Sequence, residues 1–175
     1  MKFASCILSL ILAAQASLAF GQNSNKKDSL SVYIFMSEDC VISQNYTKKL
    51  NELALKYQKD HIGLVGVFPN TWSKDSTIQQ FIKDYSITFP CKTDHFKTLT
   101  KKYGIHITPE VLVLNHASDA PIYKGRIDNQ YERIGRRRLK ATTNDLEEFL
   151  ISWIKDKNIS YKESIAVGCF INLNQ

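Results

Sequence analysis

Two continuous apolar segments with an amphipathic segment between them set the strongest limit on how this chain folds. Leu30–Met36 and Ile62–Phe68 are rich in β-branched and aromatic residues, and each has the length of a buried strand. Between them, residues 41–59 place apolar side chains on one helical face: Tyr46, Leu50, Leu53, Ala54 and Tyr57. A strand, a helix and a second strand in this order predict parallel strands joined by a right-handed crossover.

The middle of the chain continues this alternation. Residues 75–85 carry apolar side chains at helical spacing and predict a second helix. Ile87–Cys91 is a short strand candidate, and Pro90 within it indicates a sheet edge or a strand end, because proline donates no ladder hydrogen bond. A third helix is expected after Asp94, which can cap it. That helix should bury three side chains and end at a glycine: Phe96, Leu99, Tyr103 and then Gly104.

The last third predicts a hairpin and a final helix. Val111–Leu114 and Ile122–Ile127 flank a polar turn, so we expect an antiparallel pair. The helix should start near Asn144, where Glu147 completes a capping-box-like pattern. Its buried face would hold Leu146, Phe149, Leu150 and Trp153. The complete order, β-α-β-α-β-α-β-β-α, predicts an α/β fold with a mixed central sheet.

The N-terminal segment has the pattern of a secretory signal peptide. A short, positively charged start is followed by the apolar or small residues Ala4–Ala19, and the chain turns polar from Gln22 onward. We therefore expect a signal peptide at residues 1–21 and a single domain at 22–175 with a C-terminal tail at 156–175. The apolar run is too short for a comfortable membrane span, so we do not expect an integral membrane protein.

The exported chain would keep three cysteines, Cys40, Cys91 and Cys169. An odd number leaves one thiol free or paired with another molecule. Cys40 falls between the first strand and the first helix, where unpaired N–H groups and the helix dipole favour the thiolate, which is the nucleophilic form. Against this, the carboxylates of Glu38 and Asp39 would raise its pKa if they pointed inward.

The segments around these residues resemble the thioredoxin fold, and within it the redoxin branch. The likeness rests on the cysteine after the first strand, on the Thr-Pro step within Tyr103–Leu114, and on Phe89–Asp94, which is similar to the "FPVLxD" segment of redoxins. Asp39–Tyr46, Tyr123–Asp128 and Ala166–Cys169 extend the likeness to exported redoxin-domain proteins of bacteria. The resemblance implies a three-layer α/β/α sandwich with a mixed sheet and a redoxin-type insertion, located in the periplasm or outside the bacterial cell.

The resemblance also implies a thiol-disulfide oxidoreductase that acts on protein or small-molecule thiols and disulfides. Cys40 would attack a disulfide, but Ser43 stands where ordinary thioredoxins have a second cysteine, so the other thiol must come from elsewhere. Cys169 is the best internal candidate, either as a resolving thiol or as a staple that holds the tail. Cys91 is the rival, although its apolar surroundings favour an inert buried thiol.

Two further residues follow from the same likeness. Pro109 is expected to be cis, and together with Thr108 it would form a shelf facing the substrate. Pro109 could also serve the fold alone. We expect it to have both the structural role and the substrate-facing role.

A peroxidase is one alternative. Ser37-x-x-Cys40 resembles the Thr/Ser-x-x-Cys of peroxiredoxins, whose hydroxyl and a nearby arginine orient the peroxide. The usual preceding proline is missing, and Thr108-Pro109 occupies the region where that arginine is commonly found. Arg126 is the arginine that could reach the site instead. Disulfide exchange is therefore favoured over peroxide reduction.

A non-catalytic binding module is the other alternative, with residues 124–140 as its working surface. This segment holds seven basic and two acidic residues, in a chain whose net charge is +6. It predicts either a solvated loop or a docking surface for an anionic partner or membrane headgroups. We do not expect nucleic acid binding, because the segment lacks interleaved aromatic residues. No cofactor or metal is expected, because the histidines are scattered and a set of Cys40, Cys169 and His106 lacks paired-cysteine spacing.

Overall fold

A computed structural model describes residues 29–174, so the expected signal peptide at 1–21 lies outside the described residues. The first half of this range contains β1 (Leu30–Phe35), α1 (Val41–Tyr57), the short 3-10 helix η2 (Gln58–Asp60), β2 (Ile62–Phe68), α2 (Asp75–Asp84) and β3 (Cys91–Thr93). The second half contains α3 (Thr98–Lys102), β4 (Ile107–Thr108), β5 (Glu110–Asn115), β6 (Ala120–Gly125), β7 (Tyr131–Arg133), β8 (Arg136–Arg137), α4 (Asp145–Lys155), β9 (Lys162–Glu163) and β10 (Cys169–Phe170).

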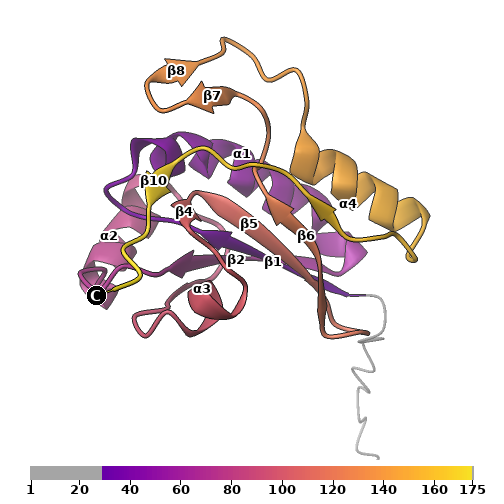
Figure 1. The fold of residues 1–175 in the computed structure, drawn as a ribbon, viewed down its shortest axis with the longest axis horizontal. Helices are drawn as coiled ribbons and strands as arrows, with labels where there is room; N and C mark the ends of the chain where they lie inside the picture. Colours follow the sequence, from indigo (N-terminus) through magenta and orange to yellow (C-terminus); the bar gives the residue numbers. More distant parts are fainter. Residues whose placement is uncertain (1–28, 175) are drawn as a thin grey trace, which may run out of the picture.

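A mixed sheet forms the middle layer, with the strand order β3-β2-β1-β5-β6-β9 (Figure 1). β1 pairs with β2 in parallel and with β5 antiparallel, and β5 continues into an antiparallel hairpin with β6. β3 and β9 add short parallel pairings at the two edges. The mixed sheet and the parallel crossover expected from the sequence are confirmed.

The sheet is covered on both faces, which gives the predicted three layers. The larger core packs the buried faces of α1, α2 and α4 against one side, through residues such as Leu50, Phe81 and Trp153. The smaller core lies on the other side, where Ile105 and the tail residue Ile171 pack against Phe35 and its neighbours. All four side chains expected to face inward from the last helix are buried.

Two segments of the middle region differ from the sequence prediction. The strand expected at Ile87–Cys91 begins only at Cys91, although Ile87 and Phe89 are buried in the larger core. Pro90 cannot donate, and its carbonyl accepts from Gly66, so the ladder starts after it. Phe96, expected inside, is 91% exposed. The helix starts at Thr98, so Phe96 precedes the helical repeat that turns Leu99 and Tyr103 toward the core.

The caps of the last two helices are made by side chains close to the expected ones. Asp94 accepts hydrogen bonds from the backbone N–H groups of Leu99 and Thr100, as its capping role requires. At α4 the reciprocal cap comes from Glu148, which accepts from the backbone N–H of Asn144. Glu147 was expected in that role, but its carboxylate instead accepts from Lys56 of α1.

Candidate active site

Cys40 lies at the N-terminus of α1, in the loop that leaves β1. Its carbonyl accepts the first helical hydrogen bond from Gln44, and its own backbone is extended, as expected for the residue that precedes a helix. The side chain is only 1% exposed. Its thiol donates to the carbonyl oxygen of Thr108, 3.1 Å away, so the end of β1 and the residue before Pro109 meet at this sulfur.

The C-terminal tail brings Cys169 to the same place. β10 pairs antiparallel with β4, with Cys169 opposite Thr108, and the pairing continues where Ile171 donates to the carbonyl of His106. The two sulfurs are 2.7 Å apart and are not bonded to each other. Since a disulfide bond is about 2.05 Å long, closing the bond requires only a small approach of the two atoms.

Gly168 lets the tail approach this closely. A Cβ atom at this position would lie 2.1 Å from the carbonyl oxygen of Thr108, a separation that no real side chain tolerates. The absence of a side chain therefore sets the position of β10 against β4, and with it the position of the Cys169 sulfur.

The pKa values of the two thiols are shifted in opposite directions. Burial raises the pKa of Cys40, but hydrogen bonds from the Cys169 thiol and from the backbone and hydroxyl of Ser43 outweigh it and hold that pKa below its ordinary value. The pKa of Cys169 is raised to about 12 by burial and by the hydrogen bond and negative charge of its neighbour. Cys40 is thus the more acidic sulfur of the pair, and Cys169 is the thiol that donates to it.

The acidic residues before Cys40 do not oppose this arrangement. Both oxygens of the Glu38 carboxylate accept hydrogen bonds, one from Ser73 and one from Thr77. Asp39 accepts from the indole N–H of Trp72, 3.1 Å away. The carboxylates are thus held by residues 72–77, and the inward orientation that would raise the pKa of Cys40 does not occur.

The structure also places the other predicted site residues. Ser43 is fully buried one helical turn after Cys40 and accepts a hydrogen bond from the backbone N–H of Ser37. The Ser37 hydroxyl itself accepts from Asn70, at 2.8 Å. The Thr108–Pro109 peptide bond is cis, and Thr108 is 2% exposed beneath β10.

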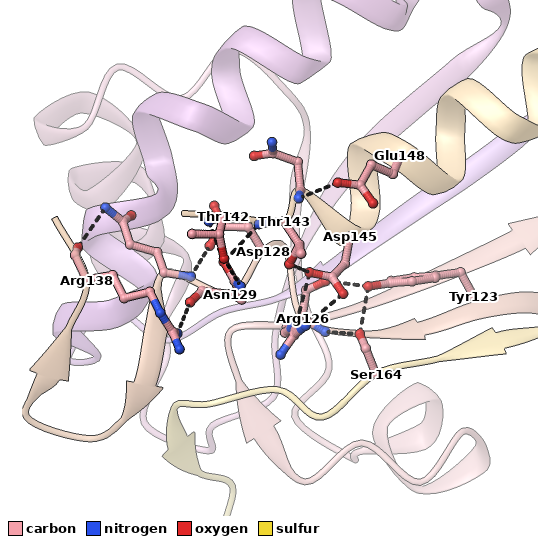
Figure 2. Close-up of polar contacts among 12 residues, drawn as sticks. Tyr123, Arg126, Asp128, Asn129, Arg138, Thr142, Thr143, Asp145, Glu148 and Ser164 are labelled. Atoms are coloured by element: carbon pink, nitrogen blue, oxygen red, sulfur yellow. Dashed lines mark hydrogen bonds and ion pairs between the residues drawn. The ribbon is translucent and has the colours of Figure 1, made fainter. Parts of the chain in front are cut away.

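Arg126 is held elsewhere by its own partners. Figure 2 shows its guanidinium in a two-pronged contact with the Asp145 carboxylate at the start of α4, with both N–O distances 3.0 Å. Its backbone N–H donates to the hydroxyl of Ser164, which also contacts Tyr123. The guanidinium that was expected to face a substrate is therefore paired with the start of α4, while the backbone N–H of Arg126 binds the tail.

Cys91 stands apart from the pair. It begins β3 at the edge of the sheet, opposite Gly66 of β2, whereas Cys40 and Cys169 meet around β4. Burial raises the pKa of Cys91 to about 11. The interpretation as an inert thiol matches this environment.

The basic segment, residues 124–140, contains a hairpin that was not predicted from the sequence. Part of it folds into the hairpin β7–β8, which projects from the body on the side of α1 (Figure 1). Tyr131 of the hairpin accepts a hydrogen bond from Asn45 of α1, and Asp128 before it accepts from Tyr46 and Lys49. A cavity of about 480 Å³ lies between α1 and the hairpin and reaches Cys169. The signal available in the sequence was the pair of apolar residues, Tyr131 and Ile134, within the basic run.

Two kinds of feature do not occur in the described part of the chain. Among residues 29–174, no three His, Cys, Asp or Glu side chains are grouped as metal ligands. Within the same range, the chain contains no helix with the length and apolarity that crossing a bilayer requires.

The fold and the neighbouring thiols define a thioredoxin-like protein. The chain belongs to the AhpC/TSA family, whose profile matches residues 19–119, a range that includes Cys40 and Pro109 and ends before the tail. The redoxin resemblance inferred from the sequence is thereby confirmed. No curated protein matches the sequence.

Solved structures of other proteins share this fold. A hypothetical protein from Sinorhizobium meliloti 1021 is 20% identical with a TM-score of 0.70, covering 85% of this chain and 81% of that one. An uncharacterized conserved protein from Geobacillus kaustophilus is 18% identical with a TM-score of 0.71, covering 84% and 78%. A secreted disulfide oxidoreductase of Mycobacterium tuberculosis is 12% identical with a TM-score of 0.51, covering 74% and 84%. At these identities the likeness concerns the fold.

Proposed function

We propose that this protein is an exported thiol-disulfide oxidoreductase of the redoxin type, with Cys40 as its nucleophile and Cys169 as the second thiol. The observation that carries the proposal is the 2.7 Å separation of two sulfurs that are 129 residues apart in the chain and differ in acidity. A thiolate beside a protonated thiol is the arrangement that disulfide exchange requires, because the thiolate attacks and the neighbouring sulfur completes the exchange.

The exchange moves two electrons between the pair and a partner. In the reducing direction, the Cys40 thiolate attacks a disulfide sulfur, and the cycle ends with a Cys40–Cys169 disulfide and two partner thiols. In the oxidising direction the Cys40–Cys169 disulfide takes two electrons from two partner thiols, which become a disulfide, and the two cysteines are released as thiols. Ser43 would stabilise the Cys40 thiolate in both directions, while Thr108 and Pro109 would fix the surface that faces the partner.

Export is the second part of the proposal. The signal-like pattern at residues 1–21 supports it, and one solved structure with this fold is a secreted disulfide oxidoreductase. A periplasmic or extracellular location would allow the Cys40–Cys169 disulfide to form and persist, because such compartments are oxidising.

Disulfide mapping by mass spectrometry tests the thiol chemistry directly. The exported protein would be alkylated before and after treatment with a mild thiol reductant. We expect a Cys40–Cys169 disulfide that opens readily, with Cys91 free in both samples. Three free thiols with no Cys40–Cys169 disulfide, under conditions that oxidise a control dithiol, would contradict the proposal and favour the binding-module alternative.

The peroxidase alternative lacks its oriented partners in this structure. The Ser37 hydroxyl is bound to Asn70, and the Arg126 guanidinium is paired with Asp145. Peroxide consumption with a dithiol as the electron source distinguishes the two activities. We expect disulfide reduction to proceed much faster than peroxide reduction, and the opposite ranking would establish a peroxidase.

A further inference from the structure

The two sulfurs of the candidate site differ in access as well as in acidity. Cys40 is 1% exposed beneath the tail, whereas Cys169 is partly exposed. The cavity between α1 and the hairpin β7–β8 is lined by Cys169 and not by Cys40. A partner that enters this cavity therefore meets the sulfur of Cys169 first.

The tail also occupies the backbone edge beside Pro109. Thr108 is paired with Cys169 across the β4–β10 ladder, and Gly168 packs on its carbonyl. A partner strand cannot take that edge while β10 is in place. The accessible route to the thiol pair is thus the cavity on the hairpin side.

Resting on the proposed function, we propose that this cavity binds a polypeptide segment with an apolar side chain and a carboxylate next to its cysteine, and that the mixed disulfide forms at Cys169. Two observations select this partner. The cavity volume of about 480 Å³ lies in the range of pockets that enclose a drug-sized ligand, which is room for a few side chains. Its lining combines exposed apolar surface with a cation.

Apolar residues face the cavity from both sides. Val41, at the start of α1, is 63% exposed, and Ile134, at the tip of the hairpin, is 60% exposed. Exposed apolar side chains that line one concave site indicate a partner that covers them. An apolar side chain beside the partner's cysteine would fill this place.

The positive charge in the lining of the cavity comes from Arg137. The guanidinium lies over the ring of Tyr131, 5.6 Å from its centre. Glu132, the acid of the hairpin, is paired with both Arg136 and Arg138, and within residues 29–174 no carboxylate lies at ion-pair distance from Arg137. Asp39 also lines the cavity and carries a negative charge, and its carboxylate accepts a hydrogen bond from the neutral indole of Trp72. An acidic residue of the partner would complement Arg137.

The exchange at Cys169 conserves bonds and electrons. A partner thiolate attacks the Cys169 sulfur of the Cys40–Cys169 disulfide, the bond between the two cysteines breaks, and Cys40 leaves as the thiolate. A second thiol of the partner then attacks the partner's sulfur in the mixed disulfide. Cys169 leaves and takes up a proton. The partner loses two electrons and the cysteine pair gains them. This order applies when the pair oxidises a dithiol partner. In the reducing direction of the proposed function, the Cys40 thiolate attacks the partner's disulfide, so Cys169 carries the mixed disulfide only in the oxidising direction.

The first test locates the mixed disulfide. The oxidised Cys91→Ser protein is mixed with a short peptide that has one cysteine between a leucine and a glutamate, and early samples are quenched with acid, alkylated and digested for mass spectrometry. We expect the peptide on Cys169 and the alkyl group on Cys40. Peptide on Cys40 would overturn the inference and leave the proposed function intact. Failure to obtain any Cys40–Cys169 disulfide would instead count against the proposed function.

The second test concerns the cavity. We expect the glutamate peptide to react about tenfold faster than a matched lysine peptide at low salt, and we expect high salt to reduce this preference. Arg137→Gln should remove the preference, whereas Arg133→Gln, on the same hairpin outside the cavity, should keep it. Ile134→Ser should slow the leucine peptide severalfold, and Leu139→Ser, fully exposed nearby, should not.

The remaining outcomes decide the partner class. Equal losses in Arg137→Gln and Arg133→Gln would show a diffuse charge effect and overturn the cavity as the docking site. A small anionic thiol that reacts as fast as the glutamate peptide would overturn the polypeptide partner. Because the salt and peptide comparisons use the wild-type hairpin, they decide the matter even if an Arg137 variant folds poorly.

Discussion

Cys40 and Cys91 both follow apolar segments and are both largely shielded from solvent, yet their environments drive their acidities apart. Burial raises the pKa of each thiol. Cys40 also receives hydrogen bonds from Ser43 and Cys169, which more than offset its burial. Cys91 gains only a weak contribution from the backbone of Gly66, and its pKa rises to about 11.

The comparison shows that local donors, rather than exposure, separate a reactive cysteine from an inert one in this fold. The backbone N–H groups in the first turn of a helix have no acceptor within the helix, whereas those of an inner strand donate to the neighbouring strands. Cys40 sits at the former position and Cys91 beside the latter.

The largest expected effect comes from removing each thiol in turn. Cys40→Ser should lower disulfide exchange by about a thousandfold or more, because a serine hydroxyl is not ionised near neutral pH. Cys91→Ser should leave the rate within about twofold, since its thiol lies apart from the pair. The measurement is the rate of reduction of a peptide disulfide with a dithiol as the reductant. A similar loss in both variants would erase the contrast between the two thiols.

The second prediction concerns pH. Because the pKa of Cys40 lies below its ordinary value, the thiolate and the exchange rate should rise with pH and level off below the range of a free thiol. Lowering the pH through that pKa protonates Cys40 and should slow exchange. Cys91, with a pKa of about 11, should be ionised only to about one part in ten thousand at pH 7. NMR of isotope-labelled cysteine Cβ atoms follows both titrations without needing solvent access, and overlapping curves would contradict the prediction.

The sequence predicted one side of this contrast better than the other. The strand, helix and strand at the start are long and regular in their periodicity, so they fix where Cys40 stands and why it is acidic. β10 has only two residues, and no pattern of that length predicts a pairing. Cys169 could therefore be linked to Cys40 only through likeness, while the contact itself depends on the fit of Gly168 against Thr108.

The sequence predicted how much positive charge residues 124–140 carry, but not which groups the arginines contact. Arg126 and Arg137 both belong to the basic segment, but Arg126 finds Asp145 nineteen residues further on, and Arg137 finds a tyrosine ring. Composition cannot distinguish these outcomes, because the ion pair depends on where α4 begins relative to β6. The predicted burial of Phe96 is wrong for a different reason, because the helical repeat starts only at Thr98, after Phe96.

The third prediction tests the tail that places Cys169. Gly168→Ala puts a Cβ atom 2.1 Å from the Thr108 carbonyl oxygen, so β10 must shift and move the Cys169 sulfur away from Cys40. We expect a loss of about 1–3 kcal/mol in unfolding free energy and a slower closure of the Cys40–Cys169 disulfide. Denaturant unfolding and timed alkylation measure the two effects.

Gly63 supplies the matched control for that variant. It lies on β2, and a Cβ atom there would meet no atom within 4 Å. Gly63→Ala should therefore leave disulfide closure unchanged and shift stability by less than about 0.5 kcal/mol. Disulfide closure that is equally slow in both variants would show that the tail does not position Cys169.

The smallest expected effect isolates one donor at Cys40. Ser43→Ala removes the hydroxyl that bonds to the sulfur but keeps the helix, the backbone N–H and Cys169. It also removes the acceptor of the Ser37 backbone N–H, 3.3 Å away. The pKa of Cys40 should rise, because a hydrogen bond to the charged form is lost, and exchange near neutral pH should slow about three- to tenfold. Cys91 in the same molecule serves as the reference, since its titration should not move. If the Cys40 titration is unchanged as well, the Cys169 thiol and the helix N-terminus would account for its acidity without the serine.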